Sequence, residues 1–343
     1  MLSKCIRPTN KGNRFGKPLL RKNRSIRLFG CLASIQIVIY SGACQLQAQV
    51  PSKQATRSFE RESDIETYFK LEDVPRWDGG YLLGYLGNLS SAPTIYSISR
   101  TGKLEQILFT LKDAAQISLN DIAASPDGEI VVVGTAVSAD SRAAAFLARV
   151  SADRTRQVVT QLWPYFPSVL TVTPDGTVWT IGQLKDEANI RVISKDVLRR
   201  FDSSGRLLGS KVLEVRGTHL QHLSFLRSSR SLVGWFTRDG QYLEFGLDGA
   251  ELGRYDGPQG IEDLDSSQWK NFSLTLTSDG EVVLAKANGA KPEMFLLDRS
   301  ARTWKPVTLP EEQSRPWRRI LGADGNTVVT NGPSGRLGRF RTR

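Results

Sequence analysis

Six copies of one hairpin pattern in this 343-residue chain predict an all-β fold. In each copy, apolar residues lead into a tight turn, usually spelled Asp-Gly, and a second apolar strand follows. A second hairpin comes next, so each unit holds four antiparallel strands. From Asp78 to Asp324 the units recur every ~49 residues, a period typical of propeller blades. The sequence therefore predicts a six-bladed β-propeller over residues 59–343, with four-stranded antiparallel blades.

The turn residues justify these hairpins in order along the chain. Glycine after aspartate supplies the positive φ that a tight hairpin requires. The first hairpins are predicted to turn at Asp78-Gly79, Asp127-Gly128, Asp175-Gly176, Asp279-Gly280 and Asp324-Gly325, with a degraded copy at 227–230. The second hairpins are predicted to turn at Gly102, near Asp153, at Gly205, at Gly249, near Ala301 and at Gly335.

The last unit is incomplete, because the chain after Gly335 has room for a third strand but not for a fourth. Residues 65–71 alternate apolar and polar side chains, the period of a half-buried strand. We predict that this N-terminal strand completes the last blade. Such closure would remove an exposed sheet edge.

The N-terminal 48 residues are predicted to be a secretory signal peptide. A basic segment, residues 1–27, precedes an apolar segment, residues 28–40, and small residues follow at 41–43. The apolar segment is shorter than the ~20 residues that span a bilayer, so an uncleaved signal anchor is the weaker alternative. Residues 49–58 are predicted to form a polar linker. We expect an exported protein that is periplasmic, extracellular or held at the cell surface.

The three cysteines, Cys5, Cys31 and Cys44, lie in or directly after this leader, so residues 59–343 contain none for a disulfide. Cys44 follows Ser-Gly-Ala and resembles the lipidation box of bacterial lipoproteins, although Ser41 stands where the box has leucine. Cys44 is therefore a candidate lipidation site, with ordinary cleavage nearby as the alternative. A lipid anchor here is the one membrane attachment that we expect.

The net charge of +11 comes from the leader. Nine Lys and Arg precede residue 28, whereas 37 Lys and Arg face 35 Asp and Glu from residue 49 onward. Nucleic-acid binding needs a clustered positive face, and a nearly neutral body argues against it. We expect no nucleic-acid partner, and we expect a monomer.

The units resemble six-bladed propellers of the NHL and gluconolactonase superfamilies, in which a turn such as Pro126-Asp127-Gly128 joins the first two strands. This resemblance covers about residues 65–343 and implies a fold only. Asn120-Asp121, just before that turn, is similar to a gluconolactonase pair whose Asn helps hold a divalent metal. The resemblance thus implies a metal-ligand role for Asn120, with Ca or Zn, in a metal-dependent lactonase-like hydrolase.

The sequence departs from that family in the next blade, which offers Pro167-Ser168-Val169 in place of an Asn-Gly pair. A hard cation needs about six to eight oxygen ligands, which one Asn cannot supply. The alternative role for Asn120 and Asp121 is to cap the entry of a strand.

Signs of other catalytic chemistry are weak. His219 and His222 are the two histidines of the chain, and on a strand their spacing of three places them on opposite faces. The chain has no Gly-x-Ser-x-Gly elbow, Walker loop or dinucleotide fingerprint. Turn formation explains the recurring aspartates. The sequence leans against an enzyme and predicts no cofactor outside the hydrolase alternative.

The connections that enter the first strand of each blade predict a binding site, because in a propeller they meet at one mouth of the central channel. Aromatic rings recur there beside amides and guanidinium groups, a combination that suits a sugar ring, a peptide or an anionic small molecule. The alternative is that the tryptophans wedge between blades. We therefore expect a binding module for an as yet unidentified protein, glycan or small ligand. The predicted ligand-binding residues are Trp77, Asn120, Asp121, Tyr165, His219, His222, Trp269, Asn271, Trp317 and Arg318.

Overall fold

The computed structural model divides the chain into two units, residues 1–52 and 53–343. The structure describes residues 59–66, 76–85, 89–186, 191–214, 225–237, 239–259, 272–288, 291–307, 319–331 and 336–342, all in the second unit. Every regular element in these ranges is a β-strand, which confirms the all-β prediction. The predicted leader, Cys44 and the linker at 49–58 lie outside the described residues.

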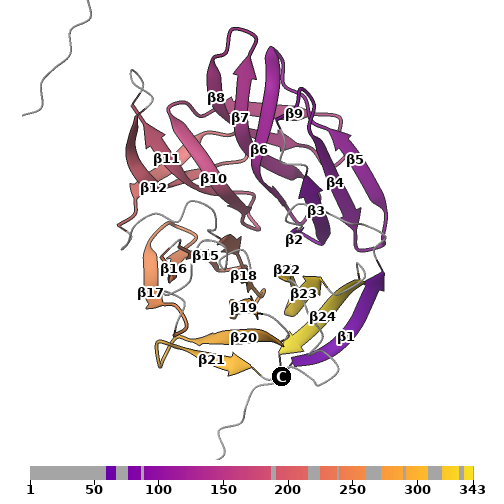
Figure 1. Ribbon diagram of the computed structural model, residues 1–343, viewed down its shortest axis with the longest axis vertical. Helices are drawn as coiled ribbons and strands as arrows, with labels where there is room; N and C mark the ends of the chain where they lie inside the picture. The colour runs from indigo at the N-terminus through magenta and orange to yellow at the C-terminus, as the bar shows by residue number, and fades with distance from the viewer. Residues whose placement is uncertain are drawn as a thin grey trace, which may run out of the picture. The chain divides into compact units, whose positions relative to one another are not determined.

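The strands form antiparallel sets of four in chain order (Figure 1). The first three sets are β2 (Arg76–Asp78), β3 (Tyr81–Tyr85), β4 (Thr94–Ser99) and β5 (Leu104–Leu108); β6 (Ala114–Ala124), β7 (Ile130–Ser138), β8 (Ala143–Val150) and β9 (Gln157–Gln161); and β10 (Tyr165–Val172), β11 (Val178–Lys185), β12 (Val192–Phe201) and β13 (Leu207–Val212). Two more sets are β14 (Phe225–Ser228), β15 (Leu232–Phe236), β16 (Gln241–Gly246) and β17 (Glu251–Asp256); and β18 (Phe272–Leu276), β19 (Val282–Asn288), β20 (Lys291–Asp298) and β21 (Thr303–Val307).

The last set combines the two ends of the described chain. β22 (Arg319–Asp324), β23 (Thr327–Asn331) and β24 (Arg336–Thr342) are followed by β1 (Phe59–Glu66), which runs antiparallel to β24 (Figure 1). A parallel bridge between Trp77 and Gly322 joins this set to β2. The pairing strand starts earlier than predicted: β1 begins at Phe59 and shares residues 65 and 66 with the predicted range 65–71, whereas residues 67–71 lie outside the described ones.

The physical reason for this offset lies in the position of β1. It is the outermost strand of its sheet, and its sequence, FERESDIE, is rich in charge. Charged side chains are common on edge strands, which have no neighbouring strand on one side. An edge strand therefore lacks the regular apolar alternation that favoured residues 65–71.

The Asp-Gly turns form as predicted. Gly128, Gly176 and Gly280 have φ values of 90°, 80° and 82°, where a side chain would be strained. The Gly176 N–H donates to the Thr173 carbonyl at 2.9 Å, and the Asp175 carboxylate accepts the Thr173 hydroxyl at 2.6 Å. Turn formation thus accounts for Asp175.

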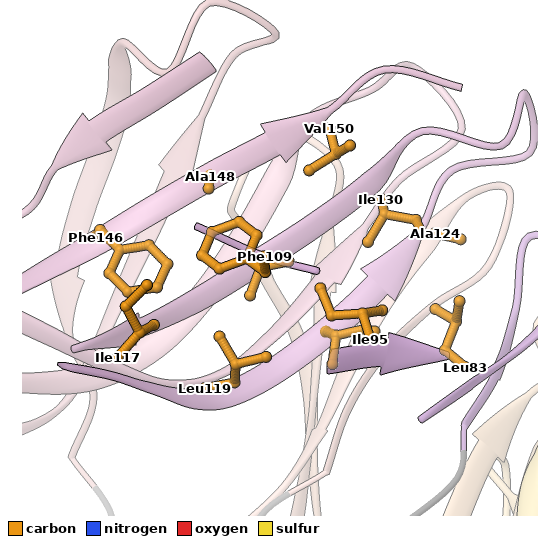
Figure 2. Packing of buried hydrophobic residues seen from close by; sticks show 12 residues of the cluster. Leu83, Ile95, Phe109, Ile117, Leu119, Ala124, Ile130, Phe146, Ala148 and Val150 are labelled. Atoms are coloured by element: carbon orange, nitrogen blue, oxygen red, sulfur yellow. The ribbon is translucent and has the colours of Figure 1, made fainter. Parts of the chain in front are cut away.

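The hydrophobic core is divided into clusters that lie between consecutive sets. One cluster joins Leu83, Ile95 and Phe109 of the first set to residues of β6, β7 and β8, and Phe109 stacks on Phe146 at 5.6 Å (Figure 2). Other clusters join each later pair of consecutive sets, and one joins the last set to the first through Trp77. The first strands follow the same order, because β2 contacts β6, β6 contacts β10, β10 contacts β14, β14 contacts β18, β18 contacts β22, and β22 contacts β2.

Arginines at the ends of third strands add polar links between sets. Arg149 donates to the Gly176 carbonyl at 3.0 Å, and Arg200 donates to the Leu247 carbonyl at 3.0 Å. Each acceptor belongs to the next set along the chain. These two arginines therefore serve contacts within the protein.

Candidate functional site

A cavity of about 630 Å³ opens where the first hairpins turn. Every set contributes to its lining, as Gly80, Pro126, Pro174, Ser229, Ser278 and Gly325 show. We call it the turn-side cavity. It lies at the end of the first strands opposite to the one where the sequence placed the binding site.

Four charged side chains line this cavity: Asp78, Arg100, Arg230 and Asp324. The buried carboxylate of Asp324 accepts hydrogen bonds from two guanidinium groups, those of Arg100 and of Arg339, the latter at 2.9 Å. Arg100 is the exposed partner of this group, with 62% of its side chain accessible to solvent. The charge of Asp324 is therefore neutralised within the protein.

Arg230 differs from the other lining arginine. It lies in the turn between β14 and β15 and is exposed. Within the described part of the chain, no carboxylate forms an ion pair with it. Its guanidinium group is thus available to a ligand.

Behind Asp78 lies a group of charges that we call the central charge cluster, formed by Arg76, Asp78, Asp121 and Arg227. Arg76 lies 3.0 Å from the Asp78 carboxylate and 3.4 Å from that of Asp121. It also donates to the Leu170 carbonyl at 2.7 Å and to the Thr171 hydroxyl at 3.1 Å. First strands of three sets are thereby tied together at one buried arginine.

Burial perturbs the acid and the base in this cluster in opposite directions. Burial raises the pKa of Asp78, and the positive charge of Arg76 partly offsets that rise. Burial, with the neighbouring charge of Arg76, lowers the pKa of Arg227 to about 9. A cationic ligand group would therefore favour the ionised form of Asp78.

The structure places Trp77 and Tyr165 in the core, which corrects their expected position at an open mouth. Trp77 is 2% exposed and contacts Leu82 and Leu321 between two sets. Tyr165 is fully buried, and its hydroxyl lies 2.9 Å from that of Thr180. Both residues belong to first strands, Trp77 to β2 and Tyr165 to β10, and neighbouring sets cover their side chains. The position of Trp77 supports the alternative that the tryptophans pack between blades.

Asp121 is brought to Arg76, whereas Asn120 contacts Pro167 and Tyr85. Asn120 is exposed at a β-bulge, and its Nδ2 donates to the Pro167 carbonyl at 2.8 Å. Asp121 accepts the backbone N–H of Leu170 at 2.8 Å within the central charge cluster. The Oδ1 atom of Asp121 also accepts the Ile122 N–H at 2.9 Å, but β6 begins at Ala114, so neither Asn120 nor Asp121 caps the entry of a strand.

The remaining predicted residues cannot be placed. His219, His222, Trp269, Asn271, Trp317 and Arg318 lie outside the described residues. Among those that are described, no group of three His, Cys, Asp or Glu side chains is arranged to hold a metal. The described chain also contains no helix long and apolar enough to cross a membrane.

Sequence reasoning missed Asp78 and Asp324 because it assigned every Asp-Gly pair to a turn. It missed Arg100 and Arg230 because both lie in the connections between strands of a hairpin. A signal was present in the residue two positions before the aspartate. Asp127 and Asp175 follow a Ser or Thr whose hydroxyl binds the carboxylate. Two positions before Asp78 and Asp324, the sequence has Arg76 and Gly322 instead of Ser or Thr. Their carboxylates are therefore free to bind arginine.

Comparison with known proteins reveals low similarity. No family model and no curated protein sequence matches the chain. Among solved structures, it is similar to a chain of the mitotic checkpoint complex (12% identity, TM-score 0.42, covering 90% of this chain and 98% of that one) and to BBS1N in complex with ARL6DN (12%, 0.43, 78% and 77%). It is also similar to the PQQ-bound aldose sugar dehydrogenase of Streptomyces coelicolor (15%, 0.46, 84% and 99%). The propeller fold of this chain rests on its own sheet order, and the likenesses carry no argument about its function.

Proposed function

We propose that this chain is an exported or surface-attached binding module built as a closed six-bladed β-propeller. Support for the blade number comes from the first strands, which contact one another in an order that returns from β22 to β2. Support for closure comes from β1, which gives the last set its fourth strand. The NHL-like resemblance stays a prediction.

We infer that the ligand site is the turn-side cavity. Ligand pockets in proteins usually measure about 300–1,000 Å³, and this cavity of about 630 Å³ lies within that range. Its lining comes from every set, so the folded domain as a whole is needed to form it. This convergence is the observation that carries the proposal, and a small polar ligand fits it better than a flat protein surface.

A cavity-filling variant tests this site. Ala323→Phe adds a ring at the lining, and we expect it to weaken by about tenfold or more any small ligand found in an unbiased thermal-shift screen. Ala301→Phe is the matched control, because Ala301 is exposed in the turn between β20 and β21. Calorimetric titration of both variants measures the difference. Equal affinities would place the ligand elsewhere.

The alternative is a metal-dependent lactonase-like hydrolase with Ca or Zn at Asn120. The observation that favours it is the exposure of Asn120 at a bulge, because bulges often re-aim side chains at functional sites. Metal analysis of the purified protein separates the two functions. A stoichiometric metal that is lost with Asn120→Ala supports the hydrolase, whereas a chelator without effect on stability supports the binding module.

Export is tested on the mature N-terminus. We expect a signal peptide over residues 1–48 to be removed in the secretory pathway. Mass analysis of the exported protein distinguishes a start near Gln49 from an acylated Cys44 at the terminus. A full-length, unprocessed chain in the soluble cell fraction would contradict this expectation.

A further inference from the structure

The charged groups at the turn-side cavity differ in how many hydrogen-bond and ion-pair partners they have within the protein. Asp324 has two arginine partners, and Arg100 is one of these. Asp127 and Asp175 lie on the same rim, but their carboxylates bind hydroxyl groups of their own turns. Asp279 binds the Asn326 side chain. These groups are therefore poor candidates for holding a ligand.

Two lining groups retain binding capacity. Arg230 has no carboxylate partner in the part of the chain that the structure covers. Asp78 has two arginines near it, Arg76 and Arg227, and the Arg76 guanidinium is shared with Asp121, Thr171 and the Leu170 carbonyl. The Oδ2 atom of Asp78 is buried and lies 3.0 Å from Arg76, but 20% of the Asp78 side chain is exposed and the residue lines the cavity. The cavity therefore offers one cation without an acidic partner among the described residues and one partly exposed carboxylate whose arginine is shared.

These two groups lie on different sides of the cavity. Asp78 ends β2, and Arg230 follows β14. In the order of contacting first strands, β14 is the third strand from β2 in both directions. A ligand that touches both groups must therefore span the cavity.

We propose that the turn-side cavity binds a small zwitterion, an amino carboxylate whose carboxylate contacts Arg230 and whose ammonium group contacts Asp78. A guanidinium group holds a carboxylate through two parallel hydrogen bonds, which supplies orientation as well as affinity. The ammonium group supplies donors and positive charge to the carboxylate of Asp78. This inference rests on the proposed function and specifies the ligand of the same site.

The experiment is a calorimetric titration of the full mature protein with a series of ω-amino carboxylates, from glycine to 6-aminohexanoate. Each is compared with the alkyl carboxylate and the alkylamine of the same chain length. We expect at least one amino carboxylate to bind about tenfold or more tightly than both of its single-charge analogues. A length preference is expected because the two charged groups are on different sides of the cavity.

Arg230→Gln tests the carboxylate contact. Arg230 is exposed and has no acidic partner among the described residues, so its removal leaves no buried carboxylate without a counter-charge. We expect it to lower amino-carboxylate affinity by about tenfold, to the level of the alkylamine, with an unchanged melting temperature. The affinity of the alkylamine itself should stay the same. Arg206→Gln removes an exposed arginine outside the cavity and should have no effect on either ligand.

Two results would overturn the proposal. One is an alkyl carboxylate that binds as tightly as its amino derivative, and the other is an unchanged affinity in Arg230→Gln. If no amino carboxylate binds but another ligand is displaced by Ala323→Phe, the ligand chemistry is wrong and the binding module stands. If no ligand at all responds to Ala323→Phe, the proposed site itself fails.

Discussion

A chain that starts at residue 67 should lose the cooperative unfolding transition that a chain starting at residue 59 retains. The reason is the pairing of β1 with β24, which runs from Phe59–Thr342 to Glu66–Arg336. Without β1, the outer N–H and C=O groups of β24 face solvent, and the last set keeps three strands. We expect a broad transition that differs between circular dichroism and tryptophan fluorescence.

A matched truncation provides the control for this prediction. A chain that starts at residue 49 contains the predicted linker in addition to β1, so it should melt like the chain that starts at residue 59. If the chain starting at residue 67 also melts at that temperature and with one sharp transition, β1 does not stabilise the fold, and closure of the propeller by this strand is refuted.

Among single substitutions that remove one partner of an ion pair, Arg299→Ala should lower the free energy of unfolding the most. Arg299 follows β20 and reaches Glu244 on β16 of the preceding set, with Nε–Oε2 and Nη2–Oε1 distances of 2.9 and 2.6 Å. Only 3% of the Glu244 side chain is exposed. Removal of one partner from a buried pair leaves an uncompensated charge, which costs about 3–5 kcal/mol. Urea unfolding monitored by fluorescence measures this loss of the free energy of unfolding.

Two further variants serve as comparisons. One removes the charge of the other partner, Glu244, and the other breaks an exposed ion pair. Glu244→Gln should cost less than Arg299→Ala, because Arg299 is partly exposed and can be solvated by water. Arg206→Ala breaks the exposed pair with Asp202 and should change the free energy of unfolding by no more than about 0.5 kcal/mol. A value for Arg299→Ala within that same range would show that water already reaches the Glu244 carboxylate.

The repeat pattern predicted the sheets because each hairpin is specified locally. Turns such as Asp175-Gly176 need a positive φ and a nearby hydroxyl, and both are visible in a few residues of sequence. The position of β1 was harder to predict, since an edge strand carries charge and no alternation. Its pairing with β24 depends on a strand at the other end of the chain.

The site was predicted less well because burial and partners depend on neighbouring sets. Trp77 looked suited to a ligand in the sequence, but it packs with Leu321 of β22 and Val329 of β23, two strands about 250 positions later in the chain. Asp121 was singled out as a site residue and does meet Arg76, whereas Arg230 looked like part of a degraded turn. Spacing along the chain locates a residue on a strand, but it does not show which carboxylate forms an ion pair with an arginine in the folded protein.

The pairing of β1 with β24 also has a consequence for the time course of biosynthesis. β1 emerges from the ribosome before every other strand described, whereas its partner β24 emerges after all of them. Contacts that are remote in sequence form slowly, because the intervening chain must lose its freedom first. During translation, β1 therefore remains without its native partner, and β5, β9 or β13 could offer it a competing edge. The charges of β1 act against such premature pairing, so a chain with a more apolar β1 should aggregate more during synthesis.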